Sequence, residues 1–309
     1  MMNIESIFHL LIVEYRLTGK IRTAETYMTT LNSLKRFCKE RPLTECEITP
    51  GFVMRFEQSL TERGLCRNTT SFYIRILRSV YNQAIERGMI KKRKADRNLF
   101  RKVYTGVDKT IKRAIRFSTI QKIFNIPIHE NTPQAFARDI FILCFCLRGI
   151  SFVDLCYLKK TNLHINYLSY TRRKTSQQIR ITLTPEIREL ITKYQSEDKI
   201  YLLPFLSSEC TQAERRKAYL RYSSQINYHL RKIGERVGLE NPLTLYVARH
   251  SWATAAKESG MSTQLISEGL GHNSESTTRI YLATLDTNEL DTAHQALLCR
   301  LSKSKSQKK

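Results

Sequence analysis

The sequence predicts a mostly α-helical protein with a small β-hairpin, divided into a helical N-terminal domain and an α+β C-terminal domain. Over the first 90 residues, apolar side chains recur every three or four positions, which is the period of an amphipathic helix. A basic stretch with few apolar residues follows at 91–113. Beyond it, alternating apolar residues at 167–184 interrupt a second series of helical patterns. We therefore expect domains at 1–90 and 114–309, joined by a basic linker at 91–113.

The N-terminal domain is expected to contain four helices. Apolar residues at helical spacing define them at 4–15, 27–37, 50–64 and 68–88. The third helix has the clearest start, because Thr49 is a good N-cap and Pro50 suits the first helical position. Four short helices with short connections are typical of a compact bundle.

In the C-terminal domain, two helices are expected before the hairpin. Ser118 and Gln121 predict a capping box for the first helix, and Thr132 followed by Pro133 predicts the start of the second. The hairpin should consist of two strands within 167–184, on either side of a polar turn. Helical patterns return after it.

The charge balance predicts a polyanionic partner. The chain has 51 Lys and Arg against 28 Asp and Glu, which gives a formal net charge of +23. Such a surplus repels itself unless a polyanion neutralises it, so double-stranded DNA is the leading expected partner. A protein that binds anionic membrane surfaces is the alternative, and it would bind liposomes without protecting DNA.

The sequence lacks the marks of a membrane-spanning or exported protein. No apolar run approaches the ~20 residues of a spanning helix, and the first residues lack the basic region and cleavage site of a signal peptide. The eight cysteines show no spacing typical of a zinc site. We therefore expect reduced thiols, a cytoplasmic and nucleoid-associated location, and no metal or other cofactor.

Breaking a DNA strand without metal or nucleotide requires three kinds of side chain. Tyrosine can serve as nucleophile, because phenolate can both attack phosphorus and leave in the reverse step. Arginine forks suit the charge on the phosphate oxygens, and lysine or histidine can protonate the departing 5′ oxygen. The sequence offers Lys174, Arg249, His272 and Tyr281 for these roles, in that order.

This arrangement resembles the C-terminal signature of the tyrosine recombinase, or phage integrase, family. The family pattern is H-x-x-R-H, then L-G-H, then a tyrosine nine residues later. Here the corresponding stretches are "YVARHSWAT" with Arg249, "GLGHNS" with His272 and "TTRIYLA" with Tyr281. The hairpin lysine of the family corresponds to Lys174. The resemblance covers nearly the whole chain.

The resemblance implies a SAM-like helical core-binding domain followed by a tyrosine recombinase catalytic domain. It implies a site-specific DNA recombinase of the integrase or invertase type, which cleaves and rejoins DNA through a 3′-phosphotyrosine intermediate. Tyr281 would attack the phosphate, Lys174 would protonate the leaving oxygen, and Arg249 and His272 would stabilise the transition state. Family members act as homotetramers on two synapsed sites, and host accessory DNA-bending proteins are further candidate partners.

Two positions depart from the family pattern. Ser151 stands where the first arginine is expected, although Asp154 fills the acidic position three residues later and would orient the site. Tyr246 stands where the first histidine is expected, and its hydroxyl keeps one hydrogen-bond donor there. A branch of the family carried by bacterial mobile elements shows this kind of variation. Ser151 and Asp154 also fit a plain helix N-cap.

Two arginines could replace the missing one. Arg172 lies two residues before Lys174 and would point to the same face of a strand. Arg148 is the second candidate, with the alternative that it binds the last carbonyls of the preceding helix. Besides the recombinase, two functions stay open: a DNA-binding protein of the same fold that has lost cleavage, and a type IB topoisomerase-like nicking–closing enzyme. The target sequence, and whether the outcome is integration, excision or inversion, are also open.

Overall fold

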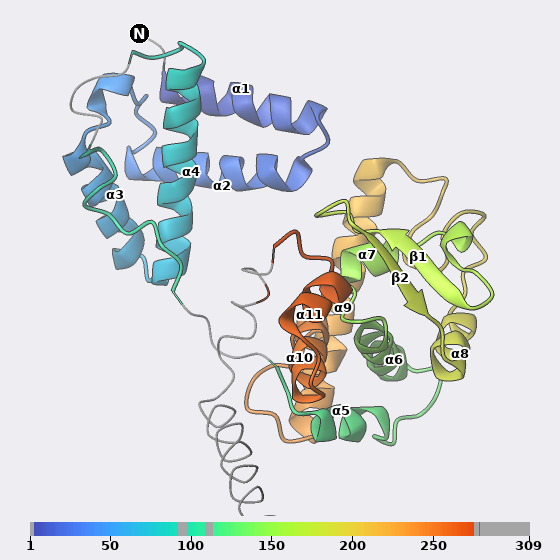
Figure 1. Cartoon of the computed structure of the whole chain (residues 1–309). Helices are drawn as coiled ribbons and strands as arrows, with labels where there is room; N and C mark the ends of the chain where they lie inside the picture. The colour runs from blue at the N-terminus through green and yellow to red at the C-terminus, as the bar shows by residue number, and fades with distance from the viewer. Residues whose placement is uncertain (1–2, 92–97, 109–113, 275–277, 279–309) are drawn as a thin grey trace, which may run out of the picture. The chain divides into compact units, whose positions relative to one another are not determined.

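The chain forms two compact units, which we describe separately: residues 1–110 and residues 111–309. The computed structural model describes residues 3–91, 98–108, 114–274 and 278 (Figure 1). The boundary between the units falls inside the stretch for which the sequence predicts a linker. No helix in the described ranges is long and apolar enough to cross a membrane.

The N-terminal unit contains the four expected helices. They are α1 (Ile4–Leu17), α2 (Ile21–Phe37), α3 (Pro50–Glu62) and α4 (Arg67–Glu86). The predicted N-cap of α3 is confirmed, because the side chain of Thr49 accepts a hydrogen bond from the amide of Phe52 at 3.2 Å. The helices bury their apolar faces against one another around Phe8, Leu31 and Phe56.

Residues 98–108 pack against the N-terminal unit. Leu99 and Val103 are buried in its core, and the amide of Tyr104 donates to Glu57 of α3 at 2.9 Å. The hydroxyl of Ser71 in α4 donates to the carbonyl of Gly106 at 2.6 Å. Part of the basic stretch after α4 is therefore held on this unit by apolar burial and hydrogen bonds.

The C-terminal unit combines helices with one two-stranded antiparallel sheet. Its elements are, in order, α5 (Phe117–Phe124), α6 (Pro133–Cys146), α7 (Phe152–Cys156), β1 (Tyr167–Thr171), β2 (Gln178–Thr182), α8 (Pro185–Lys193), α9 (Gln212–Arg236), α10 (Leu245–Glu258) and α11 (Thr263–Leu270). Helix α6 is apolar around most of its surface and lies at the centre, packed against α5, α8, α9 and α10 (Figure 1). Thr132 caps it as predicted, accepting from the amide of Ala135 at 3.2 Å.

The helix after the linker does not have the predicted capping box. Helix α5 begins at Phe117 with Arg116 as its N-cap, so Ser118 lies inside the helix. The chain is fixed just before this point, because the amide of Ile115 donates to Ser251 of α10 at 3.0 Å. A contact with a distant helix, rather than the local Ser118–Gln121 pattern, therefore sets the start of α5.

The hairpin forms where expected, but its first strand is shorter than the argument about Arg172 requires. The register pairs Tyr167 with Thr182 and Thr171 with Gln178, and β1 ends at Thr171. Arg172 and Lys174 therefore lie in the turn, where strand alternation does not apply. Their assignment to a common strand face is wrong: Arg172 is buried, whereas Lys174 is exposed.

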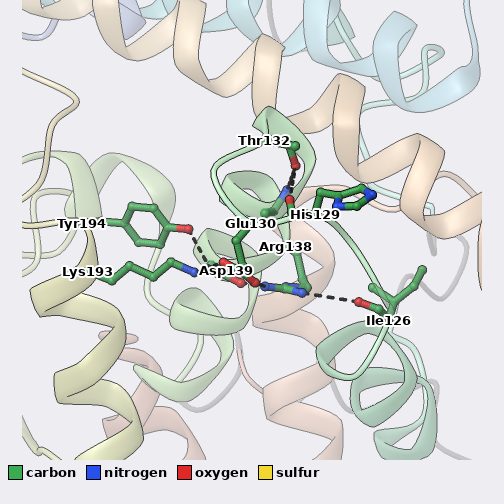
Figure 2. Close-up of polar contacts among 9 residues, drawn as sticks. Ile126, His129, Glu130, Thr132, Arg138, Asp139, Lys193 and Tyr194 are labelled. Carbon is green, nitrogen blue, oxygen red and sulfur yellow. Dashed lines mark hydrogen bonds and ion pairs between the residues drawn. The ribbon is translucent and has the colours of Figure 1, made fainter.

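A buried carboxylate, that of Asp139, joins α6 to α8 (Figure 2). Asp139 accepts hydrogen bonds from Arg138 at 2.7 Å, Lys193 at 2.8 Å and Tyr194 at 2.7 Å. Burial on its own would raise the pKa of Asp139, but these three donors lower it below the usual range. Glu130, which is more exposed, also pairs with Arg138 and Lys193. The cluster fixes α8, which follows β2 directly.

Candidate active site

Helix α10 carries Arg249 into the interior of the C-terminal unit. Arg249 is 4% exposed, and its guanidinium donates to the carbonyl of Gly149 at 2.7 Å and to the carbonyl of Leu270 at 2.6 Å. Gly149 has a φ of +66°, and a Cβ there would lie 2.9 Å from Cα of Arg249. The glycine therefore allows both the left-handed turn after α6 and the close approach of α10.

His272 follows the turn that ends α11. Gly271 caps this helix with a φ of +64°, and a Cβ there would lie 2.8 Å from Ile179 and 3.0 Å from Arg172. The turn thus needs glycine for its conformation and for its packing on the hairpin. It places His272, a residue that is 7% exposed, with its imidazole against Arg249.

Two contacts define the tautomer of His272. Nε2 lies 3.1 Å from Nη2 of Arg249, and Nδ1 lies 2.8 Å from the hydroxyl of Thr278. A guanidinium can only donate, so Nε2 accepts and the proton of the neutral ring lies on Nδ1. Burial first, and then the positive charges of Arg249, Arg172 and Lys174, lower the pKa of His272 to about 4. The ring is therefore neutral at pH 7.

Arg172 joins the same cluster from the hairpin turn. It is 6% exposed, and its Nη1 donates to the carbonyl of Gly271, which also accepts from Thr175 at 2.9 Å. Its Nε lies 3.9 Å from Oδ2 of Asp154 and has no hydrogen-bond partner among the described residues. A buried donor without a partner is costly, and an anionic ligand would satisfy it.

Asp154 connects the start of α7 to the hairpin turn. Ser151 is the N-cap of α7, and its hydroxyl accepts from the amide of Asp154 at 3.3 Å. This confirms the N-cap interpretation of Ser151. The same hydroxyl donates to Oδ2 of Asp154 at 2.6 Å, and Oδ1 of Asp154 accepts from the amide of Arg173 at 3.0 Å.

Comparison with known proteins agrees with this architecture. Residues 113–306 match the phage integrase family, and residues 4–102 match the phage integrase SAM-like domain. The chain belongs to the phage integrase family. The expected fold, a SAM-like helical domain followed by a tyrosine recombinase catalytic domain, is confirmed.

Relatives in this family include tyrosine recombinases from archaea and bacteria. Tyrosine recombinase XerA of Thermococcus onnurineus is 29% identical over 183 residues, which cover 57% of this chain and 59% of the relative. The chain thus spans about three fifths of that relative's length. Tyrosine recombinase XerD of Listeria monocytogenes is 23% identical over 296 residues, covering 90% of this chain and 92% of the relative.

The solved structures that share the fold of the chain include the following two. The integrase of the transposon Tn1549, in complex with a circular intermediate DNA, has a TM-score of 0.65 at 15% identity. That match covers 96% of this chain and all of the other. XerH recombinase bound to a palindromic difH substrate has a TM-score of 0.63 at 17% identity, covering 89% of this chain and 79% of the other.

The structure brings together four of the eight residues that the sequence suggests for the site. These are Asp154, Arg172, Arg249 and His272. Lys174 is exposed in the same turn as Arg172, close enough to His272 to lower its pKa. Tyr246, 45% exposed, lies in the first turn of α10 with its ring edge-on to His250 at 4.5 Å.

The two remaining residues lie apart from this cluster or outside the described residues. Arg148 follows α6 with a φ of +56° and is half-buried. Its side chain makes no hydrogen bond or ion pair within the described part of the chain, so the suggested bonds to helix carbonyls are not seen. Tyr281 lies outside the described residues. Its place as nucleophile stays a prediction.

Sequence reasoning missed the residues that hold the cluster together. Thr278 bonds His272 and Gly149 accepts from Arg249, but neither belongs to a recognised spacing. A glycine after an apolar helix was the available signal for Gly149. Among the described residues, no group of three His, Cys, Asp or Glu side chains comes close enough to hold a metal ion.

Proposed function

We propose that this chain is a site-specific DNA recombinase that cleaves and rejoins DNA through a 3′-phosphotyrosine intermediate. One observation carries the proposal: the guanidiniums of Arg249 and Arg172 are buried beside the same Gly271–His272 turn, and Nε of Arg172 has no partner there. Since His272 is neutral and Asp154 supplies one negative charge, a phosphate would complete the charge balance.

In the proposed mechanism, the phenolate of Tyr281 attacks phosphorus and the bond to the 5′ oxygen breaks. Lys174, exposed on the turn next to buried Arg172, protonates that oxygen as it leaves. Arg249 and Arg172 bind the non-bridging oxygens, which gain charge in the transition state. His272 orients Arg249 through the hydrogen bond at Nε2. The 5′ hydroxyl of a partner strand then reverses the attack and releases the tyrosine.

Helix α9 supports DNA as the partner. Its outer face exposes Lys217, Arg221, Arg231 and Lys232. Asn227 of the same helix accepts from the amide of Leu245 at 2.9 Å, so the middle of α9 touches the start of α10, one turn before Arg249. In this proposal the exposed basic face of α9 follows the DNA backbone. We expect the active form to be a homotetramer on two synapsed sites in the cytoplasm, acting on nucleoid DNA.

The replacement of the family's first arginine by Ser151 favours one second candidate, a DNA-binding protein that has lost cleavage. Covalent trapping separates the two. The protein is incubated with target DNA carrying a nick next to the cleavage position, so that the released fragment diffuses away, and denaturation-resistant complexes are counted. The recombinase traps DNA, and Tyr281→Phe binds with unchanged affinity but traps none. Binding without trapping by the wild type would support the second candidate.

A further inference from the structure

Ser151 does more than cap α7. A capping side chain needs only an acceptor oxygen for the free amides of the first turn. The hydroxyl of Ser151 meets that need by accepting from the amide of Asp154, at 3.3 Å. Its proton is used separately, in a bond of 2.6 Å to Oδ2 of Asp154, which is the length of a hydrogen bond to a charged carboxylate.

The carboxylate of Asp154 is held at both oxygens. Oδ2 receives the proton of Ser151, and Oδ1 accepts from the amide of Arg173, at 3.0 Å. Arg173 lies between Arg172 and Lys174, so this bond fixes the backbone of the turn that carries both cations. The side chain of Asp154 is only 2% exposed, so water cannot take over either bond.

Without the hydroxyl proton of Ser151, the buried carboxylate of Asp154 could form a closer ion pair with Arg172. Nε of Arg172 lies 3.9 Å from Oδ2 and has no hydrogen-bond partner among the described residues. A carboxylate released by Ser151 would rotate towards this donor to form a close ion pair. That rotation would lengthen the bond to the amide of Arg173 and occupy the donor that the phosphate needs.

We propose that Ser151 is a positioning residue, whose hydroxyl proton holds Asp154 so that the turn presents Arg172 and Lys174 to the phosphate. This inference rests on the proposed function. It assigns a role in catalysis to the serine that stands in place of the family arginine. Ser151 acts through Asp154 and touches no reacting atom.

Two substitutions separate the proton from the cap. Ser151→Gly removes the hydroxyl, yet glycine is itself a fair N-cap, so α7 keeps a suitable residue at its start. Ser151→Thr keeps both the acceptor oxygen and the proton. Ser151→Gly should lower the rate of single-turnover cleavage of nicked DNA by about tenfold to a hundredfold, while its DNA affinity stays within about threefold of the wild type. Ser151→Thr should stay near the wild type in both quantities.

A second substrate tests whether Ser151 acts by positioning Lys174 through the turn. In a substrate with sulfur in place of the bridging 5′ oxygen, the leaving thiolate needs no proton, so the general acid is no longer required. The part of the Ser151→Gly defect that comes from Lys174 should disappear on this substrate and the part that comes from Arg172 should remain, so the defect should be smaller than on the normal substrate. An equal defect on both substrates, or normal cleavage by Ser151→Gly, would overturn the inference.

Hydrogen exchange of the turn gives a readout that does not depend on cleavage. In Ser151→Gly, the amide of Arg173 should exchange at least about tenfold faster than in the wild type and in Ser151→Thr. Unchanged exchange in the glycine variant would also overturn the inference. If the wild type itself traps no DNA, the proposed function fails, and exchange at Arg173 still decides whether Ser151 holds the turn.

Discussion

Nη2 of Arg249 lies 3.1 Å from Nε2 of His272, although 23 positions separate the two residues in the sequence. The contact requires a neutral imidazole, because a protonated ring would place an N–H against the guanidinium. Burial and the neighbouring cations enforce this by lowering the pKa of His272 to about 4. The contact between Arg249 and His272 is therefore sensitive to acid through the imidazole of His272.

We expect the C-terminal unit to lose stability as the pH falls from about 6.5 towards 4. Over this range an unfolded histidine, with a pKa of about 6.5, binds a proton that folded His272 does not. The contribution of the neutral ring to the free energy of unfolding is complete above about pH 6.5 and is lost as the pH falls below that value. Across this window the free energy of unfolding should fall by about 3 kcal/mol more in the wild type than in His272→Gln.

Urea unfolding between pH 4 and 8, followed by the fluorescence of Trp252, measures this difference. Trp252 is the single tryptophan and lies in α10, so it reports on the C-terminal unit. His9→Gln, on the exposed side of α1 in the other unit, is the control and should leave the pH dependence at Trp252 unchanged. Parallel pH profiles for the wild type and His272→Gln would show that the ring is not held neutral.

Arg172→Ala should lower the rate of DNA cleavage by about a hundredfold or more while DNA affinity stays within a few-fold. The reason is that Arg172 would bind the phosphate oxygens mainly in the transition state, where their charge is greatest. Arg180→Ala, an exposed arginine of β2, is the matched control. Single-turnover cleavage and filter binding measure the two quantities.

The rival assignment is tested in the same experiment. Arg148 has no bond to the cluster in the described part of the chain, so Arg148→Ala should cleave within a few-fold of the wild type. If Arg148→Ala stops cleavage and Arg172→Ala does not, the two roles are exchanged. If both variants cleave normally, the phosphate is bound by another donor.

The Asp139 cluster is expected to stabilise the C-terminal unit without taking part in catalysis. Asp139→Ala leaves Arg138, Lys193 and Tyr194 without their shared acceptor, and breaking such a buried pair should cost about 3 kcal/mol. Glu130→Ala removes a partner from the same two cations, but its side chain is 56% exposed, and the cost should stay below about 1 kcal/mol. Unfolding followed at Trp252 compares them. Equal losses would mean that burial of Asp139 does not matter.

The sequence predicted the elements whose signals are local. Helical periodicity, the caps at Thr49 and Thr132, and the spacing of Arg249 and His272 all depend on residues near one another in the chain. The argument for Arg172 relied on strand alternation, which stops at Thr171, so that pattern could not predict how the side chain of Arg172 is placed.

The parts that could not be predicted depend on contacts between distant segments. Arg172 is held by the carbonyl of Gly271, 99 positions away, and α5 starts where Ser251 holds Ile115, 136 positions away. The bond from Ser151 to Asp154 is local, yet its consequence depends on the amide of Arg173, which only the folded hairpin brings there. Patterns in one segment do not contain such information.

Salt dependence of DNA binding tests the basic face of α9. Each phosphate contact contributes about −0.9 to the slope of log K against log salt, so a protein that contacts several phosphates should give a slope steeper than about −3. The double variant Lys217→Ala, Arg221→Ala should make the slope shallower by about 1.8, as two lost contacts require. Lys122→Ala, on the exposed side of α5, is the control and should leave the slope unchanged. Fluorescence anisotropy over a salt series gives the slopes. A double variant with the slope of the wild type would place the DNA on another face, because lysine and arginine side chains that contact phosphate cannot be removed without reducing counterion release.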